Sequence, residues 1–99
     1  KQQSATYRVI KVLIDHCAAG VPLDMVSVAV ALHTEKSTLR RRLKAEGQSF
    51  SRLLAQFRIQ EAGLRLLKDD DLAQISHSLG YQSVISLRRL LKDARKFGL

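Results

Sequence analysis

Disulfides, membrane spans and secretion signals are all missing from this 99-residue sequence, and each absence excludes a class of protein. The only cysteine, Cys17, cannot form an internal disulfide, so the sequence fits a reducing compartment. No apolar run approaches the roughly 20 residues that a helix needs to cross a bilayer. No charged-then-apolar segment near the start resembles a secretion signal. We therefore expect a cytoplasmic protein that does not span a membrane.

The residue patterns that carry catalysis or bind cofactors are also missing. The sequence has no glycine-rich phosphate loop and no Ser-His-Asp arrangement with a scaffold to hold it. A metal site needs three or four ligands, whereas His16, His33 and His77 fall on different predicted elements. The acidic run at residues 69–71 is best explained as a helix-capping segment. The sequence predicts no enzyme, no cofactor and no metal.

Acidic residues are scarce compared with basic ones. Nine Asp and Glu oppose 17 Lys and Arg, which gives a formal net charge of +8. Such an excess favours polyanionic partners, and the candidates are nucleic acid and an anionic membrane surface. The length allows one domain, or two very small subdomains that share a core.

Strand-like alternation and Asn-Gly hairpin turns are absent, while helical periodicity extends along almost the whole chain. The sequence therefore predicts an all-α fold. Gly20 and Pro22 end a first helix, and Asp24 caps a short second one that runs to Leu32. The apolar stripe expected on the first helix consists of Tyr7, Ile10, Leu13, Ile14 and Cys17.

The third and fourth predicted helices occupy the middle of the chain. The third begins at Thr34 and ends at Gly47. Ser49 caps the fourth, at residues 50–68, which is apolar on two opposite sides and is therefore expected to lie between two bodies. Those sides consist of Phe50, Leu53, Phe57 and Leu64, and of Ala55, Ile59, Ala62 and Leu66.

Two further helices complete the prediction. Asp71 caps a fifth helix at residues 72–79, with Gln74 placed as in a capping box. A sixth helix covers residues 83–96, and Gly80 separates the two. Both of these helices have a counterpart earlier in the chain.

The second and third predicted helices recur as the fifth and sixth. A shift of 47 residues places Asp24 on Asp71 and His33 on Gly80, and a shift of 48 places the string LRRRLK on LRRLLK. Each copy reads as a capped short helix, a tight turn and a longer basic helix, which is the helix-turn-helix layout. We predict two helix-turn-helix subdomains joined by a long central helix, with boundaries at 1–48, 49–68 and 69–99.

The arginines of the two strings occupy equivalent helical positions. Leu39 and Leu43 set the inward face of the third helix, so Arg41 points to the opposite side, and Arg89 does the same on the sixth. An arginine-lysine stripe on one helix is often only a solvated face, but two equivalent copies favour DNA. In a major groove, arginine can donate to guanine O6 and N7. Arg41 and Arg89 are the predicted base readers.

The sequence resembles the DNA-binding domain of the AraC/XylS family of bacterial transcription regulators from about residue 22 onward. The matching stretches are TEKSTLRRRLKAEGQSF and RIQEAGLRLLKDDDLAQISHSLGY. The second contains the family's spaced arginine, alanine and leucine pair at Arg58, Ala62 and residues 66–67, and its glycine-aromatic turn at Gly80 and Tyr81. The resemblance implies that two recognition helices enter successive major-groove segments on one face of the DNA.

The resemblance also implies particular contacts and partners. Family members commonly have a separate effector-binding or dimerisation domain, and many activate transcription through RNA polymerase. The family's base-contacting positions correspond to Ser37, Arg40, Arg41, Ile85, Ser86, Arg88 and Arg89. Phosphate contacts are expected from Lys36, Arg42, Lys44, Arg52, Lys92 and Lys96.

Several positions depart from the family pattern. His33 replaces a common glycine, although histidine tolerates the left-handed conformation better than most residues. Ser76 replaces an alanine, and Ile85 is unusually apolar for a groove surface. The ending diverges after Leu91, which indicates a truncated C-terminus. We predict a sequence-specific double-stranded DNA-binding domain of a transcription activator, without a membrane partner; a basic protein-interaction module and an RNA-binding domain are the alternatives.

Overall fold

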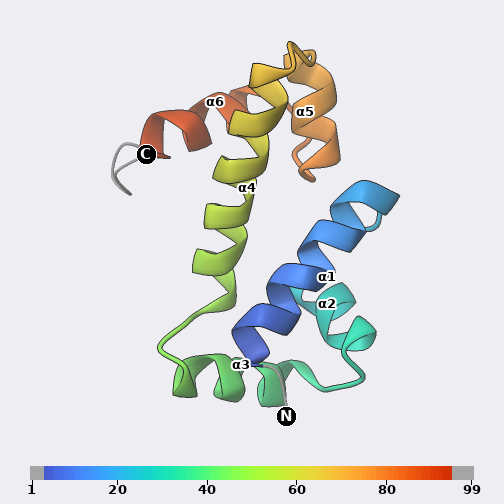
Figure 1. Ribbon diagram of the computed structural model, residues 1–99, viewed down its shortest axis with the longest axis vertical. Coiled ribbons are helices and arrows are strands. Elements are labelled where there is room, and N and C mark those ends of the chain that lie inside the picture. The colour runs from blue at the N-terminus through green and yellow to red at the C-terminus, as the bar shows by residue number, and fades with distance from the viewer. Residues whose placement is uncertain (1–3, 95–99) are drawn as a thin grey trace. The chain divides into compact units, whose positions relative to one another are not determined.

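A computed structural model describes residues 4–94 and confirms the all-α prediction, since these residues form helices and no strand (Figure 1). The chain divides into two compact units, Lys1–Leu54 and Ala55–Leu99, called unit 1 and unit 2 below. The helices are α1 (Ala5–Ala19), α2 (Met25–Ala31), α3 (Lys36–Ala45), α4 (Phe50–Leu67), α5 (Leu72–Ser78) and α6 (Val84–Asp93).

The ends of the first five helices share one turn geometry. After α2, the His33 N–H donates to the Val30 carbonyl and the Thr34 N–H to the Ala29 carbonyl. This pair of bonds is the Schellman motif, which requires a residue with positive φ. That residue is His33 after α2 (φ 55°) and Asp69 after α4 (φ 59°). The left-handed conformation expected of His33 is therefore confirmed.

Unit 1 packs α1 against both α2 and α3, and α2 against α3 (Figure 1). The centre of the unit is apolar and fully enclosed, because Val9, Leu13, Val28 and Leu43 have no exposed surface. Asp24 caps α2 as predicted, since its carboxylate accepts the Ser27 N–H at 2.7 Å. That hydrogen bond also lowers the pKa of Asp24.

Unit 2 packs α5 against α6, and the second part of α4 belongs to the same unit (Figure 1). Its core contains Ile75, Leu79 and Leu87 without exposed surface, together with the buried residues Ile59 and Ala62 of α4. Leu39 and Leu87, the first leucines of the two repeated strings, are thus both inward-facing, as their spacing predicts.

Some local predictions are wrong. On α1, Tyr7 and Ile14 are half exposed, because α2 and α3 pack on the face that holds Val9 and Leu13. On α4, the predicted apolar residues Leu64 and Leu66 are exposed.

Two predicted helix starts also differ from the structure. Glu35 rather than Thr34 is the N-cap residue of α3. Asp71 is the N-cap residue of α5, but its carboxylate accepts no capping bond, so the predicted capping box is absent. Asp71 is exposed, and water can satisfy these N–H groups instead.

Candidate nucleic-acid interface

The helix-turn-helix of unit 1 consists of α2, a turn at residues 32–35 and α3. Leu39 and Leu43 anchor α3 to the body of the unit, with 2% and 0% of their surface exposed. The turn is short and closed by the backbone bonds of His33 and Thr34, which fixes where α3 begins. The side of α3 opposite its leucines is therefore presented to solvent as a rigid surface.

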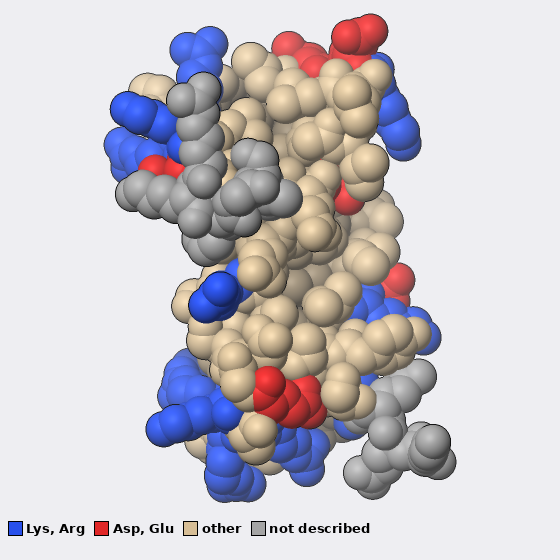
Figure 2. Space-filling view, turned by 60° about the vertical axis from the view of Figure 1, so that its left-hand side comes forward, with Lys and Arg blue, Asp and Glu red and all other residues tan. Residues whose placement is uncertain are grey.

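The outward surface of α3 is strongly basic. Figure 2 shows Lys and Arg side chains gathered over the end of unit 1 that holds this helix. All of the predicted contact residues of α3 are exposed, namely Lys36, Ser37, Arg40, Arg41, Arg42 and Lys44. Within residues 4–94 none of the five cations forms an ion pair, so their charges remain available to an external anion.

The five cations are distributed around α3 rather than aligned. At about 100° per residue, Arg41 lies opposite the buried leucines, while Arg40 and Arg42 lie about 80° to either side of them. The structure agrees with this division: Arg40 donates to the Met25 Sδ atom at 3.8 Å, and Arg42 lines a cavity on the α1 side. Arg41 is therefore the cation of α3 that points most directly away from the body of the unit.

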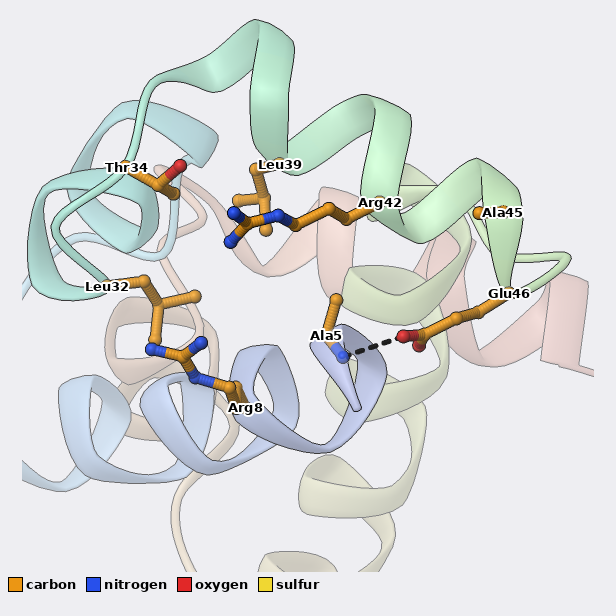
Figure 3. Close-up of a pocket in the computed structure, with 8 residues that line it drawn as sticks. All are labelled: Ala5, Arg8, Leu32, Thr34, Leu39, Arg42, Ala45 and Glu46. Atoms are coloured by element: carbon orange, nitrogen blue, oxygen red, sulfur yellow. Dashed lines mark hydrogen bonds between the residues drawn. The ribbon is translucent and has the colours of Figure 1, made fainter. Parts of the chain in front are cut away.

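A carboxylate fixes the orientation of α3 relative to α1. The Glu46 Oε2 and Oε1 atoms accept the Ala5 and Thr6 backbone N–H groups at 2.8 Å each, and the Thr6 hydroxyl donates to Oε1. Figure 3 shows the bond between Ala5 and Glu46. These bonds, first the one from the Thr6 hydroxyl, lower the pKa of Glu46. Ser4 also caps α1, through a bond from the Tyr7 N–H. Sequence reasoning missed Glu46, whose partners lie about 40 residues away in the chain.

The helix-turn-helix of unit 2 consists of α5, a turn at residues 79–83 and α6. Arg58 of α4 holds its turn: Nε donates to the Leu79 carbonyl at 3.0 Å, and Cζ lies 4.5 Å from the Tyr81 ring centroid. The family motif includes Arg58, Gly80 and Tyr81, and the structure gives a physical reason for this grouping. The reason is that the guanidinium bonds the turn and stacks on its aromatic residue.

Two more polar contacts tie the helices of unit 2 together. Arg65 bonds Asp70 at 3.0 Å and also the Ser78 hydroxyl, which joins the end of α4 to α5. The Ser76 hydroxyl donates at 2.7 Å to the carbonyl of Ser83, the N-cap residue of α6. Ser76 is 2% exposed, so the departure from the family's alanine supplies a buried bond that positions α6.

The outward surface of α6 is less basic than that of α3. Arg88, Arg89 and Lys92 are exposed, Ser86 is half-buried, and Ile85 exposes 68% of its surface. Leu87 alone anchors this helix as a fully buried leucine, whereas Leu91 is half-buried. Arg52, near the start of α4, is exposed in unit 1. The predicted contact Lys96 lies outside the described residues.

Two features that would indicate other kinds of site are absent from residues 4–94. No helix in that part of the chain is long and apolar enough to cross a membrane. The same residues bring together no group of three His, Cys, Asp or Glu that could hold a metal ion. The basic outer surfaces of α3 and α6 are the features that a ligand site can be built on. Two short-helix, turn, long-helix units of this kind define a helix-turn-helix protein.

Comparisons with known proteins give the family. A family model described as a helix-turn-helix domain matches residues 28–96, which is most of the chain. The chain belongs to the AraC-type helix-turn-helix family. The structure is similar to that of a DNA-binding transcriptional dual regulator from Escherichia coli K-12, with 26% identity and a TM-score of 0.79, over 94% of this chain and 83% of that one. The search of curated proteins found no match.

Proposed function

We propose that the chain binds double-stranded DNA sequence-specifically, with α3 and α6 each entering a major groove, as the DNA-binding part of a transcription regulator. The observation that carries the proposal is the set of five exposed cations without ion pairs on α3, with Arg41 opposite the leucines that anchor the helix. Family membership and the likeness to a DNA-binding regulator from E. coli support the same function. In this proposal, residues 49–68 connect the two helix-turn-helix subdomains.

The contacts divide into base readers and phosphate anchors. Arg41 and Arg89 lie opposite their anchoring leucines and read guanines, while Ser37, Arg40, Ile85, Ser86 and Arg88 contact neighbouring base edges. Ile85 suits a thymine methyl group, because its side chain is 68% exposed. The phosphate anchors are Lys36, Arg42, Lys44, Arg52, Lys92 and Lys96, and they make affinity depend on salt.

Selection of bound duplexes from a random pool, followed by footprinting, tests the proposal. We expect one motif of roughly 15 to 20 base pairs, because two half-sites one helical turn apart span about that length. Binding that is indifferent to sequence would instead support a basic protein-interaction module. A preference for RNA over duplex DNA would support an RNA-binding domain.

Arg41→Ala provides the sharper test at the level of one residue. We expect the variant to lose about 1 to 3 kcal/mol of binding to the selected motif and to relax the preference at one base position. Arg42→Ala is the matched control on the same helix, because a phosphate anchor weakens all sequences alike. Equal losses on all duplexes for both variants would make Arg41 another phosphate anchor.

The direction of regulation extends the proposal. We propose activation through contact with RNA polymerase, in a protein whose effector-binding or dimerisation domain lies outside this chain, as in other members of the family. Transcription from a promoter that carries the selected motif would rise when the full protein is added. A fall in transcription would identify a repressor.

A further inference from the structure

A cavity of about 360 Å³ lies beside α3, on the side that faces α1 (Figure 3). Its walls come from α1, from the turn before α3 and from α3 itself. The lining residues are Ala5, Arg8, Leu32, Thr34, Leu39, Arg42, Ala45 and Glu46. The cavity therefore belongs entirely to unit 1, and it adds α1 to the surface around the recognition helix.

Two guanidinium groups from different helices face this cavity. Figure 3 shows the side chains of Arg8 and Arg42 extending toward its Thr34 end, with the Glu46 carboxylate turned toward Ala5 at the other end. Neither guanidinium group has a hydrogen bond or an ion pair within residues 4–94. The Glu46 oxygens accept three bonds from Ala5 and Thr6, so they do not neutralise the arginines.

The chemistry of the cavity suits an oxyanion. Two guanidiniums supply several N–H donors at fixed angles, an arrangement that matches phosphate or carboxylate oxygens. The Thr34 hydroxyl adds a further donor at the same end, and Leu39 behind it is 2% exposed. Both arginines lack an anionic partner, and an anion bound in the cavity would be attracted by both positive charges.

The position of the cavity favours one source for this anion. A major groove is about 12 Å wide and an α-helix with its side chains measures about 10 to 12 Å, so the flanks of an inserted helix meet the sugar-phosphate walls. Arg42 and Arg40 occupy opposite flanks of α3, about 80° from its leucines. Arg40 and Lys44 line a second cavity, of about 350 Å³, on the far flank.

We infer that the Arg8–Arg42 cavity binds a backbone phosphate of one DNA strand, while Lys44 on the far flank of α3 meets the other strand. The inference rests on the proposed function and extends the DNA-binding surface to α1. Arg8 is the residue it adds, since nothing in the helix-turn-helix layout places a contact on that helix. A phosphate held here fixes the depth and register of α3, which in turn positions Arg41.

Methylphosphonate substitution, which removes the charge of one phosphate at a time, tests the inference with the 99-residue chain and the selected duplex. In the wild-type chain, one position on one strand should weaken binding about tenfold. Arg8→Gln and Arg42→Gln should each weaken binding and become insensitive to methylphosphonate at that same position. The double variant should reduce the salt slope of binding by about 0.9, the value for one phosphate.

Lys11→Gln is the matched control, because Lys11 is an exposed cation on α1 that does not line the cavity. It should keep the wild-type response to every methylphosphonate. If Arg8→Gln behaves like Lys11→Gln while a motif is still selected, the inference is wrong and the proposed function stands. If no motif is selected, the proposed function fails, and the salt slope of the double variant on any duplex decides the inference.

Calorimetric titration with inorganic phosphate separates the two sources of the anion. Saturable binding by the wild-type chain that Arg8→Gln abolishes, without any methylphosphonate effect on DNA binding, would assign the cavity to a free oxyanion and overturn the DNA assignment. Circular dichroism spectra identical to wild type would confirm that the variants are folded, as expected for exposed side chains.

Discussion

α3 in unit 1 and α6 in unit 2 occupy the same place in two copies of one layout, yet the two units orient them by different means. α3 carries five cations and no acid, and the Glu46 carboxylate ties its C-terminal end to α1. α6 carries three cations, an exposed isoleucine and Asp93. In unit 2, two arginines of α4 make the equivalent contacts: Arg58 bonds the turn before α6, and Arg65 bonds Asp70.

Arginine side chains make the structural contacts of unit 2 but not those of unit 1. In unit 2, Arg58 bonds the turn before α6, and Arg65 bonds Asp70 and Ser78. In unit 1, the carboxylates of Glu46 and Asp24 accept structural hydrogen bonds, and the arginines of α3 form no ion pair within the described residues. The two units therefore have the same helix layout, but different kinds of side chain hold their helices in place.

The largest effect should come from removing the α4 arginine on which the turn of unit 2 depends. Arg58→Ala loses a charged hydrogen bond to the Leu79 carbonyl and the stack on Tyr81, worth together about 2 to 4 kcal/mol. Residue-resolved amide hydrogen exchange should show the loss in α5 and α6. Arg58→Lys should recover only part of it, since lysine lacks the planar fork. An equal loss of exchange protection in α2 and α3 would contradict the expectation that Arg58 stabilises only unit 2.

The turns of the two units differ at one equivalent position, glycine against histidine. Gly80 has φ 86°, so Gly80→Ala should cost about 1 to 2 kcal/mol, although its Cβ would meet only the Arg58 Nη2 atom, at 3.4 Å. His33→Gly, at φ 55°, should change stability by less than about 1 kcal/mol, because relief of strain is offset by a freer unfolded chain. Urea unfolding measures both, and a larger effect at His33 would reverse the comparison.

Ala29 and Ser76 occupy equivalent positions of the two units under the shift of 47 residues, and both are buried. Ser76→Ala removes the hydrogen bond to the Ser83 carbonyl and should cost about 1 kcal/mol. The Ser76→Cys variant, with its weak S–H donor, should recover little of this. Thermal unfolding provides the measurement, and an unchanged Tm for Ser76→Ala would mean that water replaces the bond.

The smallest effect should be confined to acid pH and to unit 1. The pKa of Glu46 is lowered in the folded state, so its stabilising contribution is complete above the unfolded value of about 4.3 and is lost as the pH falls through the lowered pKa. Glu46→Gln should remove part of the acid dependence of unit 1 stability between neutral pH and about pH 3. Hydrogen exchange in α1 at several pH values tests this. The same dependence in the variant would assign it to another group, such as Asp24.

The sequence predicted the elements well and their contacts poorly. The six helices, the Asp24 and Ser49 caps and the left-handed His33 were all expected from local chemistry, and the structure confirms them. The buried face of α1 was misjudged, because Tyr7 and Ile14 are as apolar as Val9 and only the placement of α2 and α3 decides which side is covered.

The repeated helix-turn-helix layout and the outward direction of Arg41 and Arg89 are set by the local sequence. Both follow from a leucine period that fixes one face of a helix and thereby the opposite one. Helix packing places Arg8 and Arg42 at one cavity, Glu46 at the start of α1 and Arg58 on the Tyr81 ring. Those pairs join residues far apart in the chain, and their proximity depends on how helices pack, which no local pattern encodes.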